Sequence, residues 1–171
     1  MRTQHPLAAF SSYLSGRSQV LLSIADEVLD HLDRCAPGDD VLPFGPRARA
    51  SDLMWLWTLG AYEVTRTMCQ AHGCFSARFL AAVSDLKNDL ERVRVPNTKM
   101  EKIKYDRKGA TIPVSSDRAP DLWDAARKDL RVGDPADAVS ARLLLARYAS
   151  VMASLRADEV LMSHEDAFKP R

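Results

Sequence analysis

Apolar residues recur every three or four positions along the first part of the chain. The spacing predicts a helix with a narrow apolar seam, either continuous or built from two abutting helices. Gly16 is the expected weak point, and a turn cluster that begins at Ala36 ends the segment. The seam consists of Leu7, Phe10, Leu14, Leu21, Ile24, Val28 and Cys35.

A second apolar segment, Leu53 to Val64, follows a loop over residues 36–50 that contains three prolines and two glycines. We expect Ser51 or Asp52 to cap this helix, because either side chain can accept a hydrogen bond from an amide of the first turn. His72–Gly73 is the expected end of the helix.

The second helix is apolar almost all round, and such a helix usually has neighbours on several sides. We therefore expect it to be central in the fold. The side chains expected to be almost fully buried are Leu56, Trp57 and Val64.

Three further helices are expected in the rest of the chain. One is capped by Ser76 and ends at Val95–Pro96, since the residue before a proline disfavours helical geometry. Asp121–Leu130 reads as a short helix around Trp123. Asp134–Pro135 is a typical helix start, and the helix that it opens runs to about Arg156. With little strand signal, the sequence predicts an all-α helical bundle of four to five main helices, with residues 1–171 as one domain.

Residues 97–118 differ in character and are expected to form a long mobile basic loop, with a short extended piece at Ala110–Ser115. Five basic residues fall within ten positions against Glu101 and Asp106, a local net charge of 5 − 2 = +3. They are Lys99, Lys102, Lys104, Arg107 and Lys108, and Arg92 and Arg94 extend the run. Such a segment can contact phosphates, with Tyr105 as a stacking ring. The alternative is an ordinary solvated loop.

Composition limits the function classes only weakly. The chain has 171 residues, of which 46% are hydrophobic and 27% charged, and its formal net charge is +1. A charge so close to zero gives no global electrostatic argument for a nucleic-acid or membrane partner. The N-terminus lacks an apolar signal-peptide core, and the longest uncharged apolar stretch, Leu53–Tyr62, is about half of a bilayer span. Together with three cysteines and no C-x-x-C pair, this predicts a cytoplasmic protein with reduced thiols and no membrane association.

The polar residues in the second helix are its main candidate site. Glu63, Arg66 and Gln70 lie three and four residues apart and therefore share one face. In an otherwise apolar helix we expect them to be partly buried, where an arginine needs a partner such as Glu63. One interpretation is a structural ion pair that fixes how the helix sits in the bundle.

Arg66 and His72 also form an R-x5-H pattern, which resembles the R-x4-6-H signature of HEPN domains. That family consists of helical proteins and includes metal-independent ribonucleases of toxin–antitoxin and antiphage systems, commonly with the site at a homodimer interface. The resemblance implies that Arg66 holds the phosphate and that His72 transfers a proton near neutral pH. In such a site we expect Glu63 to orient Arg66.

Other chemical motifs in the sequence are weaker. Cys69, His72 and Cys74 have a C-x2-H-x-C spacing that could bind zinc only with Cys35 as the fourth ligand. Residues 163–166 (SHED) contain triad letters in one short run, whereas a triad is assembled from distant segments. No glycine-rich phosphate loop, metalloprotease motif or EF-hand is present, so we expect neither a metal nor a cofactor.

Three functional hypotheses follow from the sequence. The first is a non-catalytic helical interaction or regulatory module that acts through a protein partner or through self-association. The second is a HEPN-like ribonuclease that uses Arg66, His72 and Glu63. The third is a nucleic-acid-binding protein that uses residues 92–108 to contact RNA or another nucleic acid.

Overall fold

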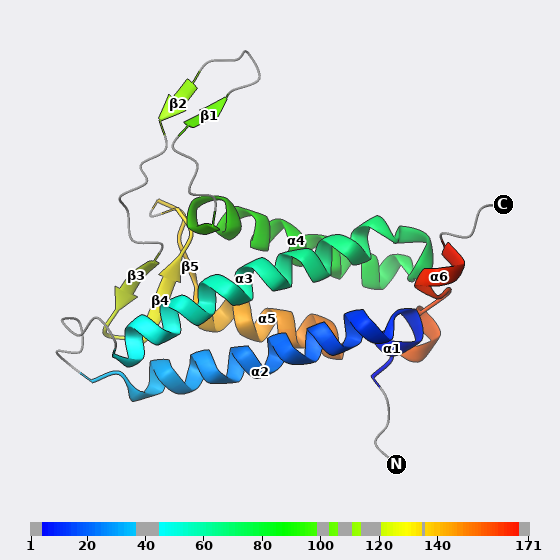
Figure 1. Cartoon of the computed structure of the whole chain (residues 1–171), viewed down its shortest axis with the longest axis horizontal. Helices are drawn as coiled ribbons and strands as arrows, with labels where there is room; N and C mark the ends of the chain where they lie inside the picture. Colours follow the sequence, from blue (N-terminus) through cyan, green and yellow to red (C-terminus); the bar gives the residue numbers. More distant parts are fainter. Residues whose placement is uncertain are drawn as a thin grey trace.

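The apolar seams of the sequence pack against one another as four long helices in a computed structural model of the chain (Figure 1). The structure describes residues 5–36, 45–98, 103–105, 111–113, 121–134 and 136–167. The long helices are α2 (Ser12–Arg34), α3 (Pro46–Gln70), α4 (Ala77–Thr98) and α5 (Ala141–Ala153). The short ones are α1 (Leu7–Phe10), η2 (His72–Cys74), η3 (Ala157–Glu159) and α6 (His164–Ala167). The predicted helical bundle is confirmed.

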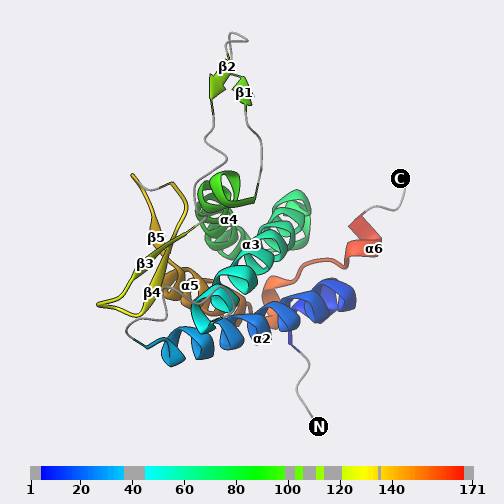
Figure 2. The same ribbon diagram turned by 60° about the vertical axis from the view of Figure 1, so that its left-hand side comes forward.

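The four long helices form a ring in which each is antiparallel to its two neighbours. Each helix has a side-chain contact with each of its two neighbours. Neighbouring helices run in opposite directions along the bundle (Figure 1). The pairs are Glu27–Arg49 between α2 and α3, Tyr62–Arg94 between α3 and α4, Asp89–Arg147 between α4 and α5, and Asp33–Arg142 between α2 and α5. Figure 2 shows α5 opposite α3, with α2 and α4 on either side.

The centre of the bundle is an aromatic contact between opposite helices. The Trp57 ring of α3 meets the Tyr148 ring of α5 edge to face, with 5.4 Å between centroids, and both side chains are fully buried. The Tyr148 hydroxyl lies 3.0 Å from the Ser18 hydroxyl of α2. Burial raises the pKa of Tyr148 to about 12, because the charged phenolate is poorly solvated there.

The predicted burial of α3 is only partly right. Trp57 and Val64 are buried as expected, but Leu56 is 48% exposed. The ring of helices leaves one side of α3 facing solvent, and Leu56 lies on that side. Arg49, Asp52, Glu63 and Gln70 are the other exposed residues of α3, so Leu56 is the apolar exception on a polar side.

The prediction of a helix at Asp121–Leu130 was wrong. A small antiparallel sheet occupies this part of the chain. It contains β3 (Asp121–Asp124), β4 (Asp129–Val132) and β5 (Val139–Ser140) in the order β3-β4-β5. Leu130 and Val132 of β4 are buried, so the sheet covers the end of the bundle where α5 begins. The β3–β4 turn contains Lys128 with a φ of 46°, a left-handed conformation that side chains disfavour.

Several helix boundaries also differ from the sequence expectation. The first helical segment is interrupted at Ser11, whose side chain caps α2, rather than at Gly16. α3 begins at Pro46, five residues before Ser51, and Ser51 instead donates a hydrogen bond to Asp121. Asp134 accepts from the Ala136 amide in a turn, and the last long helix begins later, capped by Ser140. The strand pairing of β5 keeps residues 139–140 extended and delays the helix.

Within the predicted basic loop the structure describes two short antiparallel strands, β1 (Ile103–Tyr105) and β2 (Thr111–Pro113). β2 confirms the short extended piece expected at Ala110–Ser115. Helix α4 continues to Thr98, slightly beyond the expected end at Pro96. Among the helices that the structure describes, none combines the length and apolarity required to span a bilayer.

Candidate functional site

The Glu63–Arg66 pair of α3 forms as predicted, but it is not buried. Arg66 Nε donates to Glu63 Oε2 at 2.9 Å, and the two side chains remain 44% and 49% exposed. Both lie on the side of α3 that faces solvent. Arg66 is partly buried as expected, whereas Glu63 and Gln70 are exposed. The pair is an ordinary solvated i,i+3 contact.

His72 lies outside α3 rather than in its last turn. The helix ends at Gln70, and His72 opens the short η2 helix, where its side chain is exposed. The hydrogen-bond partner of Arg66 is Glu63 on its own helix. Arg66 and His72 are thus both accessible from solvent, one within the last turns of α3 and the other just beyond its end.

The basic residues at the end of α4 contact other parts of the bundle. Arg92 forms an ion pair with Asp137, and this hydrogen bond raises the pKa of Arg92. The Arg94 guanidinium lies over the Tyr62 ring, 4.5 Å from its centroid. Lys104 lies in β1, whereas Lys99, Lys102, Arg107 and Lys108 lie outside the described residues. Phosphate contact by this segment stays a prediction.

The cysteine and triad motifs do not assemble into sites. No disulfide joins Cys35, Cys69 or Cys74, and within the described part of the chain no group of three His, Cys, Asp or Glu residues is placed to hold a metal ion. Cys35 follows α2, at the opposite end of the bundle from Cys74 (Figure 1). Ser163 donates directly to Asp166, and the His164 ring packs edge-on against Phe10.

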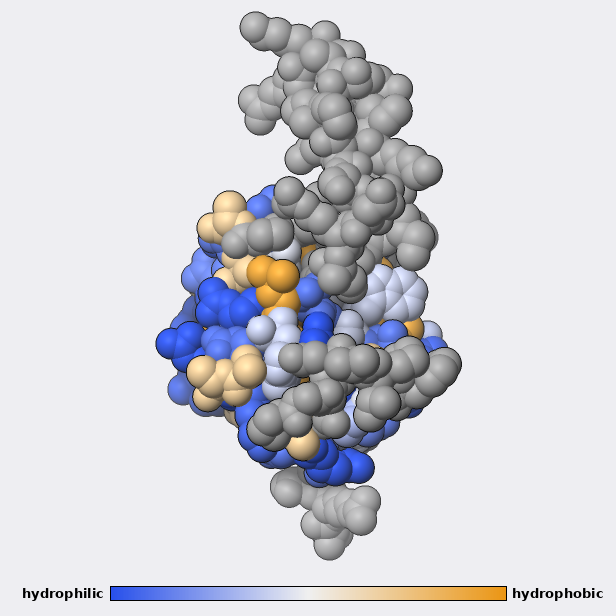
Figure 3. Space-filling view, turned by 90° about the vertical axis from the view of Figure 1, so that its left-hand side faces the viewer, coloured by the Kyte–Doolittle hydropathy of each residue, from blue (hydrophilic) through white to orange (hydrophobic). Residues whose placement is uncertain are grey.

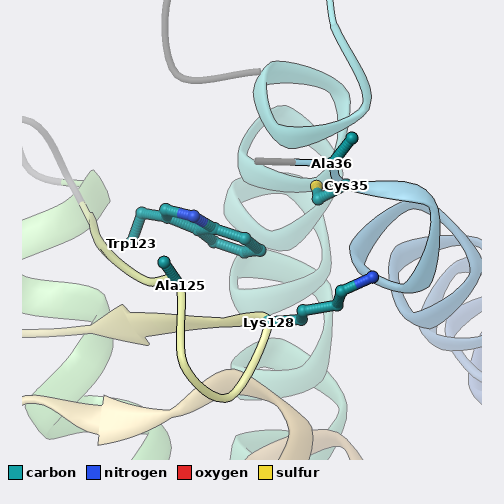
Figure 4. A pocket seen from close by; sticks show the side chains of 5 residues that line it. All are labelled: Cys35, Ala36, Trp123, Ala125 and Lys128. Carbon is teal, nitrogen blue, oxygen red and sulfur yellow. The ribbon is translucent and has the colours of Figure 1, made fainter. Parts of the chain in front are cut away.

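A small hollow lies between the C-terminal end of α2 and the β3–β4 turn (Figure 4). Its volume is about 80 Å³, and it is lined by Cys35, Ala36, Trp123, Ala125 and Lys128. Pockets for organic ligands typically enclose about 300–1,000 Å³. The hollow is therefore too small to serve as an ordinary substrate or cofactor pocket.

A buried carboxylate anchors the segment after α5 to the start of α4. Glu159 is only 2% exposed and accepts hydrogen bonds from Arg78 Nε at 2.6 Å, the Ser76 hydroxyl at 2.8 Å and the Arg156 amide at 3.2 Å. These donors, Arg78 first, lower the pKa of Glu159 to about 2. Ser76 also caps α4 as predicted, accepting from the Phe79 amide. The contacts are internal and indicate a structural role.

The most unusual surface of the bundle follows the groove between α2 and α3. On α2, Tyr13, Val20 and Glu27 are spaced by seven residues, and so are Arg49, Leu56 and Glu63 on α3. Residues seven apart lie two turns along nearly the same side of a helix. We call these six residues the α2–α3 outer face. Tyr13 and Val20 of the α2 row are 69% and 53% exposed. Together with Leu56 of the α3 row, they place three large apolar side chains in solvent.

Two contacts fix the register of these rows. Arg49 Nη2 and Glu27 Oε1 lie 3.5 Å apart at one end of the face. Further along, Gly60 lets Leu21 approach so closely that a Cβ at Gly60 would lie 2.7 Å from Leu21 Cδ2. Because α2 and α3 are antiparallel, Val20 and Leu56 fall in the middle of the face, one on each side of the groove.

Sequence reasoning missed this surface, although part of its signal was present. Tyr13 and Val20 do not belong to the buried seam of α2, and their seven-residue spacing places them together on a neighbouring side. The role of Leu56 depends on which side of α3 the fold leaves open, and its spacing alone could not reveal that.

The end of the bundle near β3 and the start of α3 has a different character. In Figure 3 the visible described side chains there are mostly hydrophilic, with apolar groups in small separate spots. Isolated exposed apolar residues of this kind are normal on soluble proteins.

Comparisons of the chain with protein-family models, with curated proteins and with solved structures found no match.

Proposed function

We propose that this protein is a non-catalytic helical interaction module and that it binds a protein partner through the α2–α3 outer face. The partner presents an apolar helical surface that covers Tyr13, Val20 and Leu56. The observation that carries the proposal is the exposure of Leu56, a large apolar side chain within the apolar stretch Leu53–Tyr62 of α3.

An apolar side chain in such a stretch is suited to burial against a neighbouring helix. The chain supplies three neighbours for α3, namely α2, α4 and the opposite helix α5. The remaining side carries Leu56 between the exposed residues Arg49 and Glu63, and the adjacent helix α2 exposes Tyr13 and Val20. Burying each such side chain contributes about 1.5–3 kcal/mol relative to leaving it in water. Aligned apolar groups of this kind, with charged residues around them, are typical of a contact surface rather than of a reactive site.

A ribonuclease activity of Arg66 and His72 remains the second candidate. The observation in its favour is that both side chains are accessible from solvent, so an RNA backbone can reach them. Against it, Arg66 is already paired with Glu63 on an open helix surface.

The interaction proposal is tested by site-specific photo-crosslinking in cells that produce the protein. A photoreactive amino acid is placed at position 56 and, as a matched control, at position 143. Leu143 is an exposed leucine on the outward side of α5 and is 73% exposed. We expect a discrete crosslinked product from position 56 that disappears when Val20→Glu is added, and no such product from position 143.

Thermal melting of the Val20→Glu protein is the folding control, since Val20 is already exposed and the melting temperature should change little. Equal crosslinking from positions 56 and 143, or a product that survives Val20→Glu, would contradict the proposal.

A further inference from the structure

We infer that the partner which covers the α2–α3 outer face is a second copy of this chain, docked across a two-fold axis that passes through Leu56 and Val20. This inference rests on the proposed function and names its partner. In the pairing, α3 lies antiparallel against α3 of the other copy, and α2 lies antiparallel against α2.

The order of charges along α3 favours an antiparallel pairing with a second copy. Arg49 and Glu63 lie seven residues on either side of Leu56, which is about 10 Å in each direction along the helix. An antiparallel pairing centred on Leu56 therefore places Arg49 of each copy opposite Glu63 of the other. Arg49 already contacts Glu27, and Glu63 already pairs with Arg66 within each chain. The pairing therefore joins these charges into two symmetrical clusters of alternating sign, which flank a central leucine–leucine contact. A parallel pairing would instead set Arg49 against Arg49 and Glu63 against Glu63.

The row on α2 has the same design. Glu27 and Tyr13 lie seven residues on either side of Val20. Tyr13 is bound by Arg17, whose Nη2 donates to the Tyr13 hydroxyl at 2.9 Å and whose guanidinium lies 4.9 Å from the ring centroid. The antiparallel pairing places Glu27 of one copy against this Tyr13–Arg17 unit of the other. Opposite charges again meet at both ends.

The two rows form one surface. The close approach of Leu21 at Gly60 holds α2 against α3, and the Glu27–Arg49 contact ties their ends together. Val20 and Leu56 therefore belong to one surface that a second copy can cover. An isologous two-fold contact requires a face that complements itself, and both rows meet this requirement with the same axis.

The oligomeric state of the purified protein is the first measurement. Sedimentation velocity over a range of concentrations should show a monomer–dimer equilibrium. Leu56→Glu should shift it to monomer, because the two-fold axis would place two buried carboxylates together. Leu143→Glu, the matched control on α5, should leave the equilibrium unchanged.

Charge reversal tests the register. Arg49→Glu should raise the dissociation constant about tenfold or more, because each copy would then set two carboxylates against each other. Adding Glu63→Arg to the same chain should restore most of the affinity, since the reversed charges again meet across the axis.

Cysteine crosslinking tests the axis itself. In a Cys69→Ser background, Leu56→Cys should form a disulfide-linked dimer under mild oxidation, as should Val20→Cys, and Leu143→Cys should not. A mixed disulfide between a Val20→Cys chain and a Leu56→Cys chain, without the two like-to-like products, would overturn the proposed axis.

Failure of this inference is distinguishable from failure of the proposed function. A chain that stays monomeric at every concentration, while position 56 still crosslinks to a different protein in cells, would remove self-association and leave the interaction module intact. A dimer that is indifferent to Leu56→Glu would refute the assignment of this face to the second copy.

Discussion

The Arg66 guanidinium and the Glu63 carboxylate form an ion pair one helical turn apart on the solvent side of α3. Ion pairs in such exposed positions contribute only about 0–1 kcal/mol, because water screens the attraction and two long side chains lose conformational freedom. A buried pair at the same spacing would make Arg66 essential for folding. The two situations predict different behaviour of the same mutants.

Arg66→Ala is expected to lower the free energy of unfolding by less than about 1 kcal/mol, and His72→Ala should also have little effect because its side chain is exposed. Urea denaturation followed by circular dichroism measures both. Loss of about 3–5 kcal/mol in Arg66→Ala would mean that the pair is desolvated in solution.

The ribonuclease alternative predicts RNA cleavage by the purified protein in the presence of a chelator. The products should end in a cyclic phosphate or its hydrolysis product, because the 2′-hydroxyl is the attacking group. Arg66→Ala and His72→Ala should each abolish cleavage while the proteins stay folded, with Leu143→Ala as the control. If the folded wild type leaves a panel of single-stranded and structured RNAs intact, these residues have no such role on those substrates.

The buried hydrogen bond between Ser18 and Tyr148 should contribute measurably to stability. Tyr148→Phe leaves the Ser18 hydroxyl without this partner, and Ser18→Ala leaves the phenol without it. Each change should cost about 1–3 kcal/mol. The double mutant should cost less than the two single changes together, because no unpaired polar group then remains at this contact. Denaturant titrations of all four proteins give the coupling energy, and strict additivity would show that the hydroxyls do not interact.

Lys128→Gly is expected to stabilise the protein. The residue has a φ of 46°, and the left-handed region costs a side-chain-bearing residue about 1–2 kcal/mol. Glycine removes that strain but gives flexibility to the unfolded chain, so a net gain of about 0.5–1 kcal/mol is expected. Lys128→Ala is the control, because it removes the same side chain and its hydrogen bond to the Asp33 carbonyl while keeping the strain. A glycine variant no more stable than the alanine variant would show that the turn relaxes in solution.

Glu159 should make the protein sensitive to acid. Its pKa is about 2 in the folded protein, against an ordinary value of 4.5. A lowered folded-state pKa contributes stability that is fully present above pH 4.5 and is lost as the pH falls towards 2. The melting temperature of the wild type should therefore drop over this window. Glu159→Gln should lie below the wild type at pH 7 and approach it near pH 2. Parallel curves over the whole range would rule out the anchor.

The helical part of the fold could be predicted because its signals are local. The apolar seam of α2 and the Ser76 cap of α4 depend on residues within a few turns, and both are present in the structure. Trp57 was placed in the core for the same reason, since it lies within the most apolar stretch.

The errors arose where a distant partner decides the local structure. Trp123 lies in a strand because β3 pairs with β4 and packs on the end of the bundle, whereas its own neighbours in sequence also suit a helix. Asp134–Pro135 predicted a helix start, but the pairing of β5 with β4 keeps the chain extended until Ser140. In the candidate site, the shared face of Glu63, Arg66 and Gln70 was a local sign that one side of α3 would stay in solvent. Leu56 was misplaced because it is the apolar exception on that side.

The anchor at Glu159 also sets an order of assembly during synthesis. Helix α3 contacts both α2 and α4 within residues 12–98, so these three helices can pair as soon as that stretch has left the ribosome. The acceptor of Arg78, Glu159, lies 81 residues further along the chain. It is synthesised roughly 4–16 s after Arg78 at typical elongation rates of about 5–20 residues per second. During that interval Trp57 lacks its ring contact with Tyr148, and the inner apolar side of the first three long helices has no cover from α5. The residues that cover it and the carboxylate that anchors them are synthesised together, within residues 141–160.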